Sequence, residues 1–273
     1  MVNFSVLISI YKNTKYFEFK KTLNSIFNQT LLPNELVIII DGYITFDLYK
    51  LISLYMQKNI DVKIIKNNAN IQLGLSLRKG VKICKSPLII RADSDDINSK
   101  SRFKTLINYY KKNKSADVIG SYLIEKYNGS KNKYFLKKVP LNHKDIIRFF
   151  NFRNSINHPT VLLKKNTIIK AGNYEKMDFF EDYLMWLKVK SIGGKFVNIP
   201  HSLVSSNFNK NYIIRRHGTK YFLHYLNFIK FIYKKKLINK FFIFLNFFIR
   251  LFLINSPLRF KIFFYKIFLR TTI

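Results

Sequence analysis

Acidic residues are scarce in this chain, and its last third has none. The 273 residues include 15 Asp and Glu against 48 Lys and Arg, which gives a formal net charge of +33. No acidic residue follows Asp182, whereas 17 basic residues do. So uneven a charge predicts an anionic partner for the C-terminal part of the chain.

Cysteine and glycine are also rare, and each shortage excludes a class of protein. The single cysteine, Cys84, excludes an intramolecular disulfide and is typical of a reducing compartment. The nine glycines form neither the G-x-G-x-x-G pattern nor the P-loop, so no glycine-rich loop is available to cradle phosphates. Residues 1–5 lack the charged and apolar segments of a signal peptide, so we expect a cytoplasmic location.

No apolar run in the sequence is long enough to span a membrane. The longest has 14 residues and contains Asn246 and Arg250, whereas a spanning helix needs about 20 apolar residues. Residues 218–273 mix aromatic and aliphatic side chains with basic ones, including the run 234–236. This pattern predicts amphipathic helices lying on an anionic membrane surface, peripheral on the inner face of the plasma membrane. The alternative is a helical appendage that packs on the first domain, residues 1–217.

The first hundred residues alternate strand and helix patterns. The continuous apolar runs predicted as strands are residues 4–10, 36–40, 62–65 and 87–90, and the helix-length segments between them are 17–27, 46–56 and 73–83. Buried strands separated by helices are typical of a parallel sheet covered on both faces. We therefore predict an α/β fold, a mostly parallel sheet flanked by helices with a C-terminal helical appendage.

Carboxylates gather where two of these strands end. Residues 91–96 read RADSDD, and Asp41 follows the strand 36–40. Three carboxylates within four positions repel one another, and a divalent metal ion is the most economical way to hold them together. The carboxyl ends of parallel strands share one edge of a sheet, so both groups should face the same crevice. The alternative is a solvated acidic turn that caps a helix starting near Ser99.

The order and spacing of several short motifs resemble family-2 glycosyltransferases of the GT-A fold. These motifs are residues 5–11 (SVLISIY), 25–30 (SIFNQT), 35–42 (ELVIIIDG), 91–96 (RADSDD), 157–160 (NHPT), 172–174 (GNY) and 181–186 (EDYLMW). The resemblance covers residues 3–205 and is nearest in style to bacterial enzymes that build capsule, exopolysaccharide or lipopolysaccharide. The Q-x-x-R-W signature of processive members is missing from the sequence, which implies the addition of a single sugar.

The resemblance implies a site for a nucleotide-sugar donor, expected to be UDP-linked, with Mn²⁺ or Mg²⁺ as cofactor. The metal positions are Asp95 and Asp96. The implied nucleotide-sugar-binding residues are Ser9, Tyr11, Asp41, Arg91, Asp93 and Asp95. For Asp41, a hydrogen bond from the base N–H competes with an ordinary strand-end turn. Tyr11 either stacks on the base or sits at the core edge. Arg91 and Arg102 either balance the carboxylates, reach the diphosphate, or form a plain ion pair.

The resemblance implies that Asp182, with Glu181 beside it, is the general base for an inverting transfer. These carboxylates precede an expected amphipathic helix, so capping of the helix N-terminus is the alternative role. His158 precedes an expected strand over residues 160–163 and is itself expected to be structural. The implied enzyme is a hexosyl- or N-acetylhexosaminyltransferase that acts on a lipid-linked or cell-surface polysaccharide acceptor. A basic nucleic-acid-binding protein is the alternative function, disfavoured because the basic residues lie among large aliphatic side chains.

Four positions depart from the family pattern. Arg78 stands where Asn is common. Gln72 stands where relatives often have the glycine of N-x-G-L, and Lys188 replaces an arginine after the start of the E-D helix. An arginine is also usual near Asn207. These changes leave the fold prediction intact and the identity of the donor sugar open.

Overall fold

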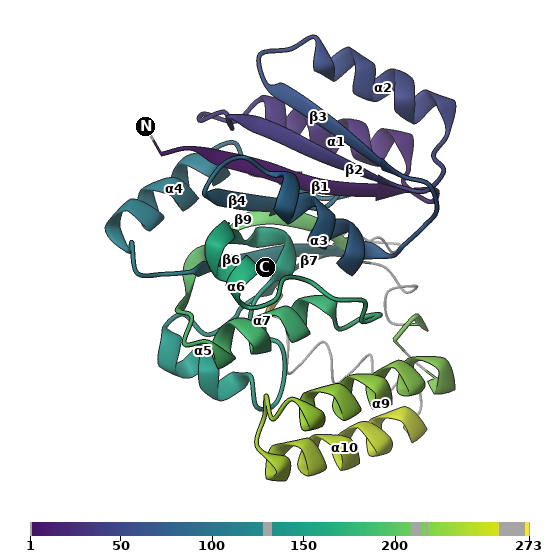
Figure 1. Cartoon of the computed structure of the whole chain (residues 1–273), viewed down its shortest axis with the longest axis vertical. Coiled ribbons are helices and arrows are strands. Elements are labelled where there is room, and N and C mark those ends of the chain that lie inside the picture. The colour runs from purple at the N-terminus through teal and green to yellow at the C-terminus, as the bar shows by residue number, and fades with distance from the viewer. Residues whose placement is uncertain (1, 128–132, 209–213, 217, 257–270, 273) are drawn as a thin grey trace.

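A single mixed sheet organises the molecule in the computed structural model, which describes residues 2–127, 133–208, 214–216, 218–256 and 271–272 (Figure 1). Its main path runs in the order β10-β7-β6-β8-β4-β1-β2-β3, and β9 pairs with β6 and β5. The strands are β1 (Phe4–Tyr11), β2 (Glu35–Asp41), β3 (Asp61–Asn67), β4 (Leu88–Ala92), β5 (Ile97–Asn98), β6 (Val118–Tyr127), β7 (Lys133–Lys137), β8 (Leu162–Lys164), β9 (Phe196–Phe208) and β10 (Thr271–Thr272). The helices are α1 (Tyr16–Phe27), α2 (Phe46–Met56), α3 (Leu73–Ile83), α4 (Arg102–Lys112), α5 (His143–Phe149), α6 (Lys165–Lys170), α7 (Glu181–Ser191), α9 (Gly218–Lys234) and α10 (Lys240–Asn255).

The predicted α/β fold is confirmed, and its parallel part is the first four strands. β1 pairs in parallel with β2 and β4, and β2 pairs in parallel with β3. Beyond β4 the sheet is mixed, because β8 runs antiparallel to both β4 and β6 whereas β9 runs parallel to β6. The parallel strands end together, so Tyr11 and Asp41 are paired in register.

Helices cover both faces of the sheet. Residues 36–40 of β2 belong alternately to two separate apolar cores, which explains why this stretch reads as an unbroken apolar run. One core takes in Phe19 of α1, Leu51 of α2 and Phe103 of α4. The other takes in Leu77 of α3 and Trp186 of α7.

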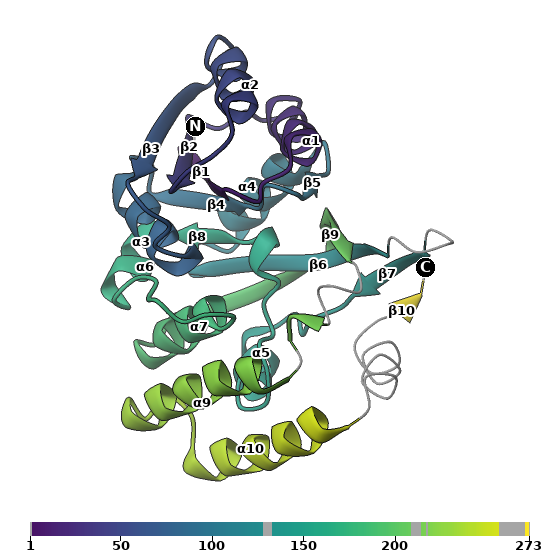
Figure 2. The ribbon, with the colours of Figure 1, turned by 90° about the vertical axis from the view of Figure 1, so that its right-hand side faces the viewer.

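α9 and α10 form a helical pair at the end of the molecule away from α2 (Figures 1 and 2). They belong to the same apolar core as α7, and the rings of Phe180 and Phe228 stack with centroids 4.8 Å apart. Asn246 of α10 also donates a hydrogen bond to the carbonyl oxygen of Asn151 at 2.7 Å. Among the helices described, none has both the length and the apolar composition that crossing a membrane would require. The division of the chain at residues 217 and 218 stays a prediction.

Two local predictions differ from the structure. The expected strand over residues 160–163 is instead a turn of 3₁₀ helix at His158–Thr160 followed by β8. α7 begins at Glu181 itself and is buried rather than amphipathic, with the consecutive residues 183–187 all buried. The reason is long-range packing, because Phe228 of α9 covers Tyr183 with ring centroids 5.2 Å apart.

Candidate functional site

A cavity of about 820 Å³ opens at the carboxyl ends of β1, β2 and β4. It also reaches the first turn of α7 and the inner sides of α9 and α10. The sequence-predicted site residues all line it: Ser9, Tyr11, Asp41, Arg91, Asp93, Asp95, Asp96, Glu181 and Asp182. The structure therefore brings together two groups of carboxylates that lie about 90 residues apart in the sequence.

Asp41 is fixed at the end of β2 by its neighbours. It is 4% exposed, and its Oδ1 accepts hydrogen bonds from the Ile71 N–H at 2.8 Å and from Asn67 Nδ2 at 3.1 Å. Lys79 Nζ in turn donates to Asn67 Oδ1 at 2.9 Å, which orients the amide. Asp41 is thus a held acceptor in the cavity wall, and Tyr11, 39% exposed, lines the same cavity.

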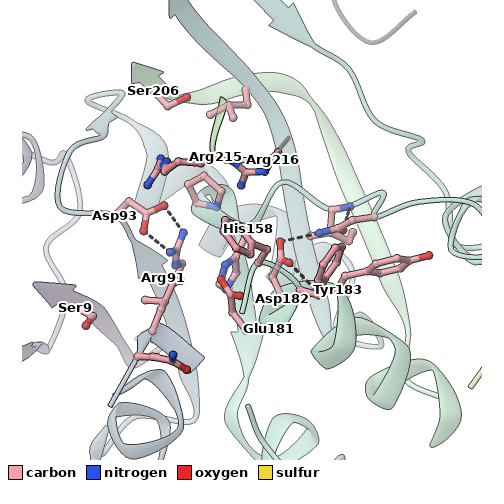
Figure 3. A pocket seen from close by; sticks show the side chains of 18 of the residues that line it. Ser9, Arg91, Asp93, His158, Glu181, Asp182, Tyr183, Ser206, Arg215 and Arg216 are labelled. Carbon is pink, nitrogen blue, oxygen red and sulfur yellow. Dashed lines mark hydrogen bonds and ion pairs between the residues drawn. The ribbon is translucent and has the colours of Figure 1, made fainter. Parts of the chain in front are cut away.

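Arg91 and Asp93 form a bidentate ion pair within the acidic cluster (Figure 3). Arg91 is buried, so its guanidinium is a fixed charge at the base of the cluster. Asp95 opens to the cavity, yet desolvation by the walls and the Asp93 carboxylate raise its pKa to about 6. Burial and both neighbouring carboxylates raise the pKa of Asp96 as well. One arginine therefore does not neutralise the cluster.

The cluster fits a divalent cation that shares its ligands with a substrate. Asp96 Oδ2 is buried and has no hydrogen-bond partner in the part of the chain that the structure describes. Within those residues, no group of three or more His, Cys, Asp or Glu side chains could hold a metal ion without other ligands. Mg²⁺ and Mn²⁺ are commonly bound by one or two carboxylates together with substrate phosphates, which matches Asp95 and Asp96.

Arg102 has a structural role. It is fully buried, and its Nη2 donates to the carbonyl oxygens of Arg91 at 2.7 Å and Pro159 at 2.8 Å. Burial lowers the pKa of Arg102 to about 9. This side chain fastens the end of β4 to the 3₁₀ turn and does not line the cavity, so it does not reach a diphosphate.

Glu181 and Asp182 form the first turn of α7 and face the cavity. Asp182 Oδ2 accepts a hydrogen bond from Asn154 Nδ2 at 2.7 Å, and Oδ1 accepts one from the Tyr183 N–H at 2.6 Å. Burial, followed by repulsion from Asp182, raises the pKa of Glu181 to about 8. Burial also raises the pKa of Asp182, opposed by the Tyr183 N–H and by cations including Arg216. Near neutral pH, Glu181 therefore keeps its proton, whereas the Tyr183 N–H favours the ionised form of Asp182.

His158 closes the cavity between the two carboxylate groups. Its Nε2 lies 2.9 Å from the hydroxyl of Tyr174, and its ring meets Trp186 edge-on. Burial and the charge of Arg91 lower the pKa of His158, so the imidazole is neutral. This agrees with the expected structural role.

Gln72 takes a backbone conformation that favours glycine. Its φ is +76° and its ψ is 157°, just before α3. The Gln72 Oε1 atom is buried without a hydrogen-bond partner in the described part of the chain. Gln72 lines the cavity together with Asn70 and Leu73. The position where the family pattern has glycine is therefore strained here.

Several lining residues escaped sequence reasoning. Asn154, which holds Asp182, lies on a loop without a recognisable motif, and Arg153 and Arg216 lie in segments that the resemblance does not interpret. The wall built by α9 and α10 was also missed. Its apolar members have ordinary core spacing, so only tertiary packing reveals that they reach a site.

Comparison with known proteins agrees with this geometry. The family model described as glycosyl transferase family 2 matches residues 5–170. The chain belongs to glycosyl transferase family 2. This glycosyltransferase is 35% identical over 218 residues to the Escherichia coli UDP-Gal:alpha-D-GlcNAc-diphosphoundecaprenol beta-1,3-galactosyltransferase, covering 80% of this chain and 78% of the relative. It is 31% identical over 218 residues to the amylovoran biosynthesis glycosyltransferase AmsE of Erwinia amylovora, covering 80% and 81%.

A solved structure shows the same fold. The crystal structure of residues 1–349 of S. aureus TarS matches with a TM-score of 0.60 at 18% identity, over 76% of this chain and 60% of that chain. The glycosyltransferase thus spans about three fifths of the TarS 1–349 chain. The expected resemblance to bacterial family-2 enzymes with a GT-A-like fold is confirmed.

Proposed function

We propose that this glycosyltransferase moves one sugar from a nucleotide sugar to a hydroxyl group of a lipid-linked glycan, with inversion at the anomeric carbon. The observation that carries the proposal is the shared cavity, where the acidic cluster of residues 93–96 faces Asp182. If the acidic cluster binds the donor and Asp182 removes the proton of the acceptor hydroxyl, both must lie in one cavity so that the two substrates meet. The E. coli relative is named for a UDP-Gal donor and a diphosphoundecaprenol-linked acceptor, which supports both substrate classes.

The donor half of the cavity suits a nucleoside diphosphate. Asp41, held by Ile71 and Asn67, can accept a hydrogen bond from a base N–H, and the Tyr11 ring is placed to stack on the base. Asp95 and Asp96 would hold Mn²⁺ or Mg²⁺. A divalent cation there would neutralise charge that grows on the departing diphosphate. TarS has been crystallised with UDP-GlcNAc, which supports a UDP-linked donor in this fold.

Asp182 acts as the general base. Its two hydrogen-bond donors, Asn154 Nδ2 and the Tyr183 N–H, fix the carboxylate in the cavity wall and favour its ionised form. Direct attack by the acceptor hydroxyl, whose proton passes to Asp182, inverts the anomeric configuration. Glu181, protonated near neutral pH, adds no second negative charge to the pair.

The test is nucleotide binding and sugar transfer with a matched carboxylate control. We expect UDP with Mn²⁺ to raise the melting temperature of the wild type, and Asp96→Ala to lose this shift together with transfer. Asp61→Ala removes an exposed carboxylate outside the cavity and should behave as wild type. Full activity of Asp96→Ala, or activity that a strong chelator leaves unchanged, would remove the metal from the mechanism.

The same proposal includes attachment to an anionic membrane surface through α10. Its exposed aromatic residues recur at helical spacing along one face: Phe241, Phe244, Phe248 and Phe252. The basic run 234–236 precedes this helix, and each basic residue near an anionic leaflet contributes about 1 kcal/mol. Inserted aromatic rings would add apolar burial.

Vesicle sedimentation tests the attachment without removing α9, whose buried side chains belong to the core. We expect the wild type to sediment with anionic vesicles, to prefer them to neutral ones and to be released by high salt. Phe244→Ser combined with Phe248→Ser should weaken binding, whereas Phe17→Ser, also exposed but on α1, should not. Equal sedimentation of all three proteins, or no preference for anionic lipid, would contradict the attachment.

A further inference from the structure

The end of the cavity beyond Asp182 is an apolar compartment. Lining residues from α9 and α10 and the segment between them form its wall: Phe228, Ile229, Ile232, Ile238 and Ile243. Tyr183 and Phe180, beside the catalytic carboxylates, pack against Phe228 and continue the same surface. Neither the polar sugar that carries the attacking hydroxyl nor water would need an apolar wall. The wall therefore indicates that the acceptor carries an apolar group.

Basic side chains surround Asp182 at the entrance to this compartment. They are Lys137, Arg153, Arg215, Arg216 and Arg250, all of which line the cavity. Burial raises the pKa of Asp182, and the charges of Lys137 and Arg216 oppose this rise. The Arg250 guanidinium carbon lies 5.3 Å from the centroid of the Tyr225 ring. In the close view, Arg215 and Arg216 lie between Asp93 and Asp182 (Figure 3).

The charges in the cavity are therefore divided between its two halves. The donor half is lined by Glu18, Asp41 and the acidic cluster of residues 93–96, and its two cations, Lys15 and Arg91, are each paired with one of these carboxylates. An anion bound there needs a further cation to bridge it to the protein. The half around Asp182 also contains Glu125 and Glu181, but its basic side chains outnumber its carboxylates, so a second anion can bind there without a metal ion.

We propose that this half binds the lipid diphosphate of the acceptor, a sugar linked through a diphosphate to a polyprenyl chain. The basic side chains around Asp182 contact the diphosphate, and the compartment walled by α9 and α10 receives the first isoprene units. The sugar hydroxyl then points back to Asp182. This inference deepens the proposed function and depends on it for the reaction, but not for the binding.

Calorimetry with farnesyl diphosphate tests the binding in the wild type. EDTA removes divalent metal, so the donor half cannot hold the diphosphate through a bridging cation. We expect farnesyl diphosphate to bind at least about tenfold more tightly than inorganic diphosphate or farnesol, because only it engages both parts of the site. In a separate titration without EDTA, UDP with Mn²⁺ should not displace it. Displacement by UDP, or equal affinity for dodecyl sulfate, would overturn the proposal.

Two variants locate the site, each with a control on the same helix. Arg250→Gln and Ile229→Gln should each weaken farnesyl diphosphate binding about tenfold, a loss on the scale of one charge-assisted contact or one buried aliphatic side chain. Lys240→Gln on α10 and Leu223→Gln on α9 alter exposed residues outside the cavity and should leave the affinity unchanged.

The outcomes separate this inference from the proposed function. Unchanged affinity in both cavity variants would overturn the lipid site even if the enzyme transfers sugar. Specific farnesyl diphosphate binding without hydrolysis or transfer of any nucleotide sugar would instead overturn the proposed function and leave the lipid site standing. Thermal melts of each variant identify any loss of folding, and the wild-type ligand series decides the question without the variants.

Discussion

Asp182→Asn should separate proton transfer from substrate binding. The substitution keeps the size of the side chain but removes its ability to accept the proton of the attacking hydroxyl. Loss of a general base typically lowers turnover about 10²–10⁴-fold, equivalent to about 3–5 kcal/mol in the activation barrier. Donor affinity should stay near the wild-type value, because Asp182 lies across the cavity from the acidic cluster.

The neighbours of Asp182 make the prediction sharper. Asn154 Oδ1 accepts a hydrogen bond from the Ile156 N–H at 3.0 Å, which orients its Nδ2 toward Asp182 Oδ2. Asn154→Ala removes this donor but keeps the base. The ionised form of Asp182 loses a stabilising partner, so its pKa should rise further and the acidic limb of the kcat/KM profile should move to higher pH.

Single-turnover kinetics and donor calorimetry provide the measurement. Asp182→Asn alone should show a large loss of turnover, and Asn154→Ala alone should show a shifted pH profile. The donor Kd should change little in either variant. Unchanged turnover in Asp182→Asn would reduce Asp182 to a helix-capping residue. An acidic limb that moves to lower pH in Asn154→Ala would show that another group is titrating.

Three further predictions concern stability. The pKa of Glu181 is about 8 in the folded state, against its ordinary value of 4.5, which stands for the unfolded state. Protonated Glu181 therefore adds to the free energy of unfolding in full below pH 4.5, and this contribution is lost as the pH rises toward 8. Urea unfolding at pH 6 and pH 8 should therefore differ less in Glu181→Gln than in the wild type. Gln72→Gly should stabilise the fold by about 1 kcal/mol and raise Tm by a few degrees, because it relieves the strain at φ +76° without removing a side-chain cap; a lower Tm would show that no strain is stored there. Arg102→Lys should destabilise the fold by about 1–3 kcal/mol, because a lysine cannot satisfy the carbonyls of both Arg91 and Pro159 as the guanidinium does, and an unchanged urea midpoint would contradict this.

The donor half of the site was predictable because local patterns determine it. Unbroken apolar runs identify buried parallel strands, and such strands end at a common edge. Asp41 and the acidic cluster of residues 93–96 therefore had to meet once the strands were assigned. The resemblance then supplied Glu181 and Asp182, and in the structure these carboxylates line the same cavity.

The acceptor half was not predictable because it depends on long-range packing. Nothing near Asn154 in the sequence indicates a bond to Asp182, 28 residues later. The helix that starts at Glu181 was expected to be amphipathic, yet residues 183–187 are all buried, and Phe228 of α9 packs on Tyr183. The absence of glycine at position 72 was visible in the sequence, but the positive φ of Gln72 is a property of the folded backbone.

The most direct test of the central claim is mass spectrometry of a single reaction. Wild-type enzyme would be incubated with a UDP-sugar, Mn²⁺ and a decyl-diphosphate-linked GlcNAc as acceptor. We predict a product that carries one added sugar and that disappears with a chelator, with Asp96→Ala or with Asp182→Asn. Successive additions of sugar to one acceptor, or transfer that persists in both variants, would contradict the proposed function.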